Sequence, residues 1–240
     1  MTPHDSKLSG REQVALGTMA FHFEKPAAFK FKPGQAIDLV LLEPPAADAP
    51  SARHTFSIVS APFEGDLIVA TRMRDSAFKR ALAALPIGAR VAIEGPSGSL
   101  TLHNDRARPA VFIAGGIGIT PFMSMLRQAA HDGLQQRLVL LYSNRRPEDA
   151  AYLAELQELE QRHSPLRLIA TMTAMSSSGQ AWSGSRGLVD AAFVKHAVAE
   201  LARPIYYLAG PPGLVEALRQ TLNGAGVNDD DIRSEEFYGY

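Results

Sequence analysis

The segment AVFIAGGIGITPFMSMLR, residues 110–127, decides the fold of the C-terminal half of this 240-residue chain. Its apolar start is typical of a buried parallel strand, and its end has the spacing of apolar residues expected of a helix. A strand, a glycine turn and a helix in this order place backbone N–H groups and the positive helix end against a phosphate. Because glycine has no Cβ, a ligand can approach the backbone closely at Gly116 and Gly118. The segment therefore predicts a phosphate-binding turn, although a tight turn without a ligand has the same pattern.

The turn departs from the dinucleotide-binding fingerprint at one position. Pro121 stands where that fingerprint has its third glycine. Proline fits the first turn of a helix, because the N–H that it lacks has no helical partner there. Other segments must therefore decide what the turn binds.

Composition places the chain among globular proteins and excludes several kinds of site. Hydrophobic residues make up 46% of the chain and charged residues 20%, which is ordinary for a globular domain. There is no cysteine, which excludes disulfides, cysteinyl zinc sites and cysteine-ligated iron–sulfur clusters. The 7 histidines lack metal-ligand spacing, so we expect no metal site. A formal net charge of -1 argues against general nucleic-acid binding.

The apolar segments are short. No stretch approaches the roughly 18 apolar residues of a membrane span, so we expect no membrane-spanning segment. Residues 1–10 are polar and lack the apolar centre of a secretory signal. We therefore expect the protein in the cytoplasm.

The two halves of the chain have different patterns, and we place the boundary between residues 105 and 106. The first half predicts strands over 13–23, 36–42, 55–60, 67–71 and 90–94, separated by Gly and Pro. Many short strands with turn signals indicate an antiparallel barrel or sandwich. One helix is predicted over 76–85, with Ser76 as its N-cap.

The second half alternates strands and helices after a polar linker over 104–109. Strands are predicted over 110–114, 137–142, 166–173, 205–209 and 232–237, and helices over 121–131, 147–162, 189–201 and 214–223. Alternation of this kind predicts a parallel sheet with helices on both faces.

A second cluster of chemistry occupies RHTFSIVSAP, residues 53–62, in the first half. Cations, an aromatic ring and hydroxyls gather at one strand start, which suits a ligand with a phosphate and a flat polar ring. The same residues also fit an ordinary strand, because Phe56 and Ile58 share one face and Ser57 lies opposite.

Six segments together resemble the ferredoxin–NADP reductase family, in the order in which that family has them. They are Gly34-Gln35, TFSIVSAP at 55–62, GPSG at 95–98, GGIGITP at 115–121, AGPP at 209–212 and EEFYGY at 235–240. The resemblance implies an FAD-binding antiparallel barrel over 1–105, with FMN less often in its place, and an NAD(P)-binding α/β domain over 106–240. It implies an oxidoreductase in which hydride passes from NAD(P)H to the flavin N5. Electrons then leave to a separate acceptor, which is a ferredoxin- or flavodoxin-like protein, a quinone or a small molecule.

The resemblance also implies which residues would bind the flavin. They are Arg53 or His54, Thr55, Phe56, Ser57, Thr71, Arg72, Ser76, Phe237 and Tyr240. Ser57 would place its hydroxyl near the flavin N5, and Ser76 would begin a helix whose N–H groups face the diphosphate. Glu236 would assist proton movement, and Phe237 or Tyr240 would cover the flavin face. These aromatic rings could instead only complete the core.

On the nucleotide side the resemblance implies Gly116, Gly118, Thr120, Pro121, Gly210 and Pro211. Ser143, Arg145 and Arg146 follow the second strand, where an NAD site usually has an acid for the ribose hydroxyl. Guanidinium groups suit a 2′-phosphate, so the sequence favours NADP over NAD. A solvated loop is the alternative for this segment.

Two positions depart from the family pattern. His54 stands three residues before Ser57, where the family has arginine, and Arg53 is one residue earlier. A shift of one residue on a strand reverses the face, so either residue could meet the flavin phosphate. Ala209 stands where many relatives have cysteine before Gly-Pro-Pro. These departures keep open a non-catalytic flavin- or nucleotide-binding module. A second alternative, a reductase component of an oxygenase system, differs only in its electron-accepting partner.

Overall fold

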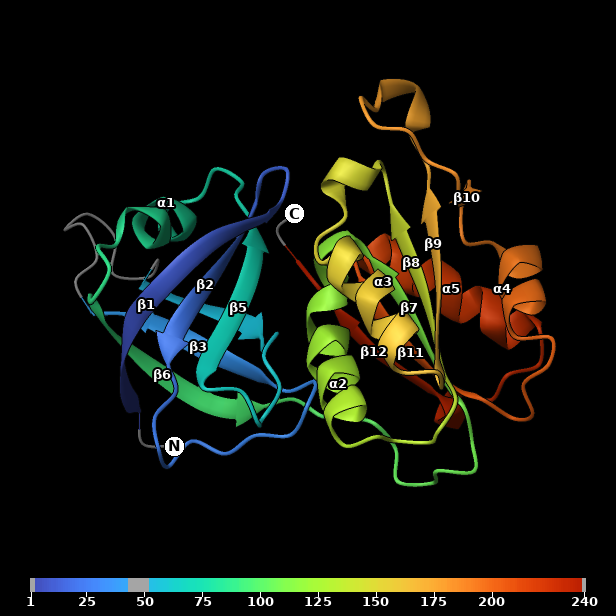
Figure 1. The fold of residues 1–240 in the computed structure, drawn as a ribbon, viewed down its shortest axis with the longest axis horizontal. Coiled ribbons are helices and arrows are strands. Elements are labelled where there is room, and N and C mark those ends of the chain that lie inside the picture. The colour runs from blue at the N-terminus through green and yellow to red at the C-terminus, as the bar shows by residue number, and fades with distance from the viewer. Residues whose placement is uncertain (1–2, 43–51, 239–240) are drawn as a thin grey trace.

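The computed structural model describes residues 3–42 and 52–238, which form two six-stranded sheets (Figure 1). The first sheet is built from residues before the segment 98–109, and the second from residues after it. None of the helices in this described part of the chain is long and apolar enough to span a bilayer.

The first sheet is an antiparallel barrel. Its elements are β1 (His4–Ala15), β2 (Thr18–Glu24), β3 (Ala36–Leu41), β4 (Arg53–Ser57), β5 (Asp66–Arg72), α1 (Ala77–Ala84) and β6 (Arg90–Ser97). The strand order is β4-β3-β6-β1-β2-β5, and every neighbouring pair is antiparallel. A bridge between Ile58, just after β4, and Val69 of β5 joins the two ends of the sheet. The expectation of an antiparallel barrel is confirmed.

One strand prediction was wrong in this half. The strand predicted over 13–23 is two strands, β1 and β2, joined by a tight turn in which Gly17 has a φ of 65°. The turn lacks the Asn-Gly or Asp-Gly pair that marks most two-residue hairpins, so it was not predictable from its residues. β1 starts at His4, inside the polar stretch: half of its residues are exposed, and hydrogen bonds to β2 and β6 hold it.

The helix predicted over 76–85 is confirmed as α1. The hydroxyl of Ser76 caps it by accepting a hydrogen bond from the N–H of Lys79 at 3.2 Å. Phe78 and Leu82 on one face of α1 join the barrel core. The strand residues of this core are led by Phe21, Phe23, Ile37, Leu39, Phe56, Leu67, Val69, Val91 and Ile93.

The second sheet is parallel. Its elements are β7 (Ala110–Gly115), α2 (Thr120–His131), β8 (Leu138–Asn144), α3 (Leu153–Arg162), β9 (Leu166–Met172), β10 (Ser185–Arg186), α4 (Ala191–Ala197), β11 (Ile205–Gly210), α5 (Pro212–Gly224) and β12 (Ile232–Glu236). The order β10-β9-β8-β7-β11-β12 means that the chain leaves β7 in one direction and returns on its other side. All pairs are parallel, as predicted.

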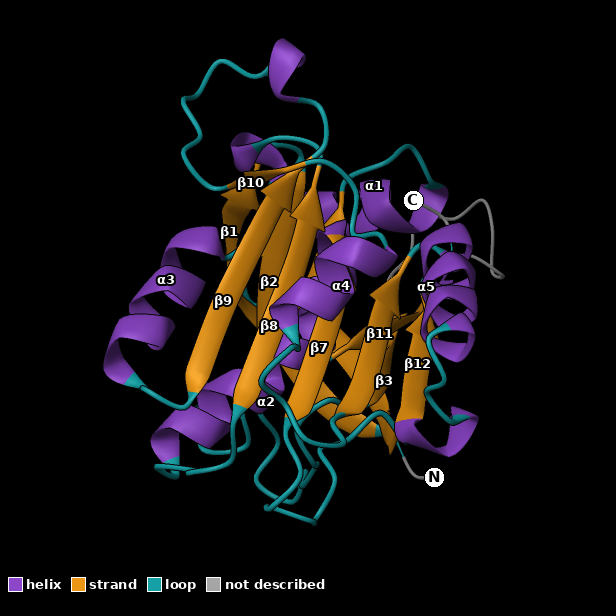
Figure 2. Cartoon of the chain, turned by 90° about the vertical axis from the view of Figure 1, so that its right-hand side faces the viewer, coloured by secondary structure: helices purple, strands orange, loops and turns teal. Residues whose placement is uncertain are grey.

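Helices cover both faces of the parallel sheet (Figure 2). Alternate residues of β7 point to opposite faces: Phe112 packs in the core with α2 and α3, and Ile113 packs in the core with α4 and α5. The helix predicted over 147–162 is interrupted, because Tyr152 has a φ of 60° and α3 starts only at Leu153.

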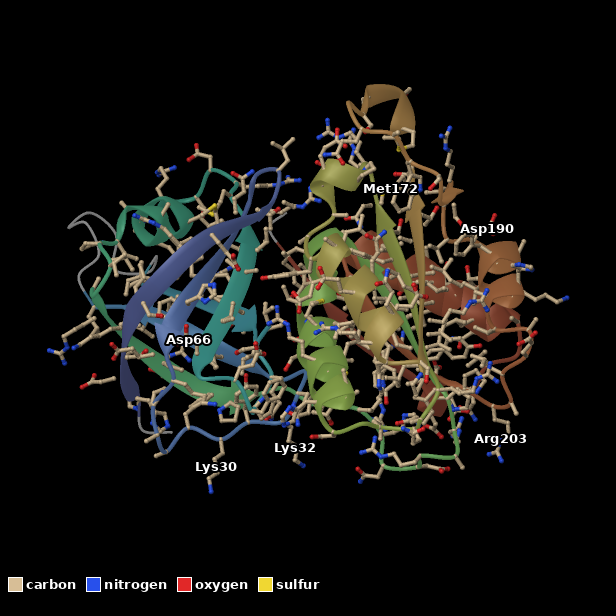
Figure 3. All side chains as sticks on the ribbon, viewed as in Figure 1. Lys30, Lys32, Asp66, Met172, Asp190 and Arg203 are labelled. Carbon is tan, nitrogen blue, oxygen red and sulfur yellow. The ribbon has the colours of Figure 1, made fainter. Side chains whose placement is uncertain are left out.

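The core shared with α2 continues onto the outer wall of the barrel. Val59, Ile68 and Ala70 belong to the same buried cluster as the apolar face of α2. Side chains of both halves fill the space between the two sheets (Figure 3). The two halves therefore meet through buried apolar contacts.

Two polar contacts of α2 fix the same junction. Ser124 donates a hydrogen bond to the carbonyl of Ser60 at 2.7 Å. Arg127 pairs with Glu155 of α3 at 2.6 and 2.8 Å and with Glu64 of the barrel at 3.5 Å. The Arg127 side chain is only 12% exposed, so these carboxylates are needed to stabilise its buried charge.

Replacing Arg127 should weaken the whole fold. We expect Arg127→Ala to lower the free energy of unfolding by about 3 kcal/mol, because it leaves two carboxylates without their shared cation. The matched control is Arg137→Ala, which removes an exposed pair with Glu200 at 3.9 Å and should change stability by less than about 0.5 kcal/mol. Urea unfolding measures both, and equal effects of the two variants would contradict the role of Arg127.

Candidate active site at the junction of the two sheets

The carboxyl ends of β7 and β11 lie side by side at the point where the strand order reverses. Gly115 ends β7 and Gly210 ends β11, and these two strands pair in parallel over 110–114 and 205–209. Open parallel sheets bind ligands in the crevice outside such a reversal point. The crevice here is the first place to look for a ligand site.

A cleft of about 290 Å³ opens at these strand ends, and we name it the strand-end cleft. It is lined by Arg72, Arg74, Gly115, Gly116, Ile117, Ser143, Asn144, Arg145, Thr173, Leu188, Pro211 and Leu214. Four of the residues predicted for the nucleotide side, Gly116, Ser143, Arg145 and Pro211, are thus brought together.

The glycine turn after β7 serves packing as well as access. Gly116 has a φ of 55°, and the turn forms a short 3-10 helix, Gly116–Ile119. A Cβ at Gly118 would collide with the backbone carbonyl of Ala209. Gly118 is therefore required for the turn to pack against β11, whereas Gly116 faces the cleft.

The other predicted residues of this turn and of β11 lie nearby. Thr120 donates its hydroxyl to the carbonyl of Ile117 at 3.0 Å, and its side chain lines the second cleft described below. Pro121 is buried in the first turn of α2, where its missing N–H costs nothing. Gly210 packs on the backbone of Gly115, with a φ of 153°.

The two arginines after β8 separate in the structure. Arg145 is exposed and lines the strand-end cleft. Arg146 turns away: two of its nitrogens donate to Asp149 at 2.8 Å each, and Glu148 lies 3.6 Å away. Arg146 lowers the pKa of the Asp149 carboxyl through this pair. The spacing of Arg146 and Asp149 three residues apart was the signal that the sequence analysis missed.

Arg72 also lies elsewhere than expected. The resemblance placed it on the flavin side, but its side chain lines the strand-end cleft. One of its Nη atoms donates to the carbonyl of Asp149 at 3.4 Å, and a Cβ added to Gly116 would lie 3.4 Å from it. A barrel residue thus reaches over the glycine turn of the other sheet.

A second cleft of about 250 Å³ lies between the barrel and β12, and we name it the barrel-side cleft. It is lined by His54, Thr55, Phe56, Ser57, Ala70, Thr71, Lys79, Ile117, Thr120, Glu235, Glu236, Phe237 and Tyr238. The residues predicted from the flavin side of the resemblance that line it are His54, Thr55, Phe56, Ser57, Thr71, Glu236 and Phe237.

Of the two candidates before Ser57, the structure brings only His54 to the barrel-side cleft. The ring of His54 packs on those of Phe56 and Phe78, with centroids 4.7 and 5.3 Å apart. Arg53 pairs instead with Asp38 and with Glu94, at 2.7 Å from the latter. Neighbouring residues of a strand point to opposite faces, so Arg53 cannot share the position of His54.

Glu235, and not Glu236, faces Ser57. The Ser57 hydroxyl donates to Oε2 of Glu235 at 3.4 Å, whereas Glu236 accepts a hydrogen bond from the hydroxyl of Tyr238. Burial raises the pKa of the Glu235 carboxyl, although the Ser57 hydrogen bond acts in the opposite direction. Both carboxylates line the barrel-side cleft, but only Glu235 reaches Ser57.

The end of the described chain closes one side of this cleft. The N–H of Phe237 donates to the carbonyl of Gly210 at 2.9 Å, and its ring packs against the core shared with α2. Phe237 therefore both completes the core and lines the cleft. Tyr240, the other predicted ring, lies outside the described residues.

Two further residues differ from expectation. Ser76 does not line the cleft, because its hydroxyl is engaged as the cap of α1. Lys79, which the sequence analysis did not select, is buried and lines it. The sequence feature that could have identified Lys79 is its place beside Phe78, on the apolar side of a short helix.

Comparison with known proteins identifies the relatives of this fold. Residues 112–220 match the sequence profile of the oxidoreductase NAD-binding domain. Ferredoxin–NADP reductase B of Sorangium cellulosum is 33% identical over 247 residues, which cover 98% of each chain. The chain belongs to the ferredoxin–NADP reductase family. The resemblance drawn from the sequence is thereby confirmed.

Some other relatives are longer than this member of the ferredoxin–NADP reductase family, and others are of similar length. The glycine betaine monooxygenase reductase subunit of Chromohalobacter salexigens is 27% identical over 230 residues, and the match spans 95% of this chain but 61% of that one. Among solved structures, the cytochrome P450 reductase of Amycolatopsis superposes with a TM-score of 0.82 at 21% identity, over 98% of this chain and 70% of that one. The ferredoxin–NADP reductase of Plasmodium falciparum gives 0.78 at 15% identity, over 98% and 96%. At these identities the structures share the fold.

Glu235 should make stability depend on pH. Since its pKa is raised, the folded chain binds this proton more tightly than the unfolded chain, and stability falls as pH rises from 4.5 through the raised value. We expect Glu235→Gln to raise Tm by about 2–4 °C at pH 8 and by less at pH 5. Thermal unfolding at the two pH values measures this, with the exposed Glu236→Gln as control. The same rise at both pH values would show that Glu235 ionises normally.

Proposed function

We propose that the chain is an NAD(P)H-dependent flavoprotein reductase that passes electrons to a separate acceptor. The observation that carries the proposal is the position of Ile117, which lines both the strand-end cleft and the barrel-side cleft. A nucleotide in the first cleft and a flavin in the second would therefore approach each other at one residue. Hydride transfer requires such proximity.

The barrel-side cleft fits FAD, with FMN as the alternative. It offers the ring of Phe56, the hydroxyls of Ser57 and Thr71, and two basic side chains, which together match a flat polar ring with an anionic tail. A bound flavin supplies a ring that takes two electrons from a nicotinamide and returns them singly or as a pair. The remaining chemistry belongs to the residues of the chain.

Ser57 and Glu235 are the pair suited to hold a proton in this cleft. Burial raises the pKa of the Glu235 carboxyl, which favours its protonated form, and the Ser57 hydroxyl lies within hydrogen-bond distance to relay the proton. Phe237 lies against the same cleft and restricts the access of water. Ser57 and Glu235 would orient the reacting ring edge and exchange protons with it.

The strand-end cleft fits NADPH, with NADH as the second choice. Arg72, Arg74 and Arg145 line it, and none of the three has a carboxylate at ion-pair distance in the described ranges 3–42 and 52–238. Guanidinium groups that are not held in a direct ion pair suit the diphosphate and the 2′-phosphate of the nucleotide. Arg146 has no part in this cleft, because Asp149 holds it.

An electron-carrier protein such as a ferredoxin is the acceptor class that we propose. The relative that matches over almost its whole length is named for that partner, whereas the reductase subunits of monooxygenases match over a part only. A cytoplasmic location stays a prediction, which cell fractionation would test.

The decisive experiment follows the colour of the purified chain. We expect a yellow protein that releases FAD on denaturation and that NADPH bleaches in the absence of oxygen. A folded, colourless protein that binds no added FAD or FMN would overturn the proposal. A yellow protein that neither nucleotide bleaches would indicate a non-catalytic binding module instead.

Arg145 should select NADPH over NADH. We expect Arg145→Ala to raise the KM for NADPH by about 10-fold or more and to leave that for NADH unchanged, because only the contact to the 2′-phosphate is lost. The matched control, Arg146→Ala, should leave the ratio of the two KM values as in the wild type. Equal increases for both nucleotides would show that Arg145 binds a part that they share.

A further inference from the structure

The barrel-side cleft contains a buried cation that the proposed chemistry of Ser57 and Glu235 does not use. Lys79 lies in the first half of α1 and is only 7% exposed. Within the described parts of the chain, no carboxylate lies at ion-pair distance from its ammonium group. Burial lowers the pKa of its ammonium group, which shows that the charged form is disfavoured here. An anionic ligand in the cleft would offset this cost.

A second base lies beside the first. His54 lines the same cleft, and the charge of Lys79 and burial both lower the pKa of its imidazole. Burial lowers the pKa of Lys79 as well, and the charge of Arg74 adds to this effect. Asp38 is engaged by Arg53 and Thr55, and its charge only partly offsets the lowering of the His54 pKa. The two bases repel each other, and an anion between them would relieve both.

The neighbouring candidates for an anion contact are already engaged. Arg53 pairs with Asp38 and Glu94, and the hydroxyl of Ser76 accepts the N–H of Lys79. Lys79 and His54 thus remain as the basic side chains of this cleft. Their place beside Phe56 and Ser57 puts them along the same wall that would hold the flavin.

We infer that Lys79, together with His54, binds the phosphate nearest the ribityl chain of the flavin. This inference rests on the proposed function. It assigns to a helix residue the contact that the sequence pattern led us to expect of an arginine on β4. A phosphate is the anion of choice because its oxygens accept charge-assisted hydrogen bonds from an ammonium and an imidazole at the same time.

One substitution should change flavin affinity and thermal stability in opposite directions. Lys79→Met removes the phosphate contact and should weaken the binding of FAD and FMN by about 10- to 100-fold. It also removes an unpaired buried charge, so the flavin-free chain should unfold at a higher temperature than the wild type. A residue that served only packing would not combine these two effects.

Riboflavin separates the phosphate contact from every other contact. It has the same ring and ribityl chain as FMN but no phosphate, so Lys79→Met should leave its affinity unchanged. Lys79→Arg keeps the charge and should recover most of the affinity for FMN. The matched control is Arg80→Met, on the exposed side of α1, where the arginine pairs with Asp75.

The test titrates the full-length chain, freed of flavin, with FAD, FMN and riboflavin and follows the quenching of flavin fluorescence. We expect Lys79→Met, and Lys79→Gln as a second variant, to lose affinity for FAD and FMN alone. If either variant weakens all three ligands alike, or none, the inference fails while the proposed function stands. If the wild type binds none of the three, the proposed function fails and the inference fails with it.

Discussion

Both clefts depend on one helix that is buried on two sides. α2 packs its apolar residues against the parallel sheet and, through the same cluster, against the barrel wall at Val59, Ile68 and Ala70. Ser124 and Arg127 add polar contacts that fix the barrel relative to α2. Without this helix in this position, Ile117 at its approach would not line two clefts at once. The arrangement of the two clefts therefore depends on how the two halves pack together, more than on either sheet alone.

Several cations without a carboxylate partner in the described part of the chain line the two clefts. Arg108, Arg127, Arg146 and Arg219 all pair with carboxylates, outside the two clefts. Arg72, Arg74, Arg145 and Lys79 have no such pairing among the described residues, and each of them lines a cleft. Arg74 and Arg145 are exposed at the strand-end cleft, whereas Lys79 is mostly covered. Fixed positive groups at these positions attract anionic ligands.

The architecture was predictable because it depends on the spacing of apolar residues and on the glycines and prolines that separate the elements. The apolar run 110–114, the glycine turn and the alternation of strands and helices predicted the parallel sheet, and the short strands of the first half predicted the barrel. Side-chain partners were not predictable in the same way. The choice between Glu235 and Glu236 is a choice of strand face, which depends on the pairing of β12 with β11. The direction of the Arg146 side chain depends on a local ion pair with Asp149. The burial of Lys79 depends on the packing of its helix against the barrel.

The position of β12 has a consequence for how the protein is made. Every strand of the barrel lies within residues 4–97, so the barrel can close while the rest of the chain is still being synthesised. β12 follows every other described element in the sequence, and it carries Glu235 and leads to Phe237. The Glu235 carboxyl and the Phe237 ring are therefore added to the cleft last, onto an already folded scaffold. A nascent chain can have the barrel wall of the cleft complete and still lack the wall that β12 supplies.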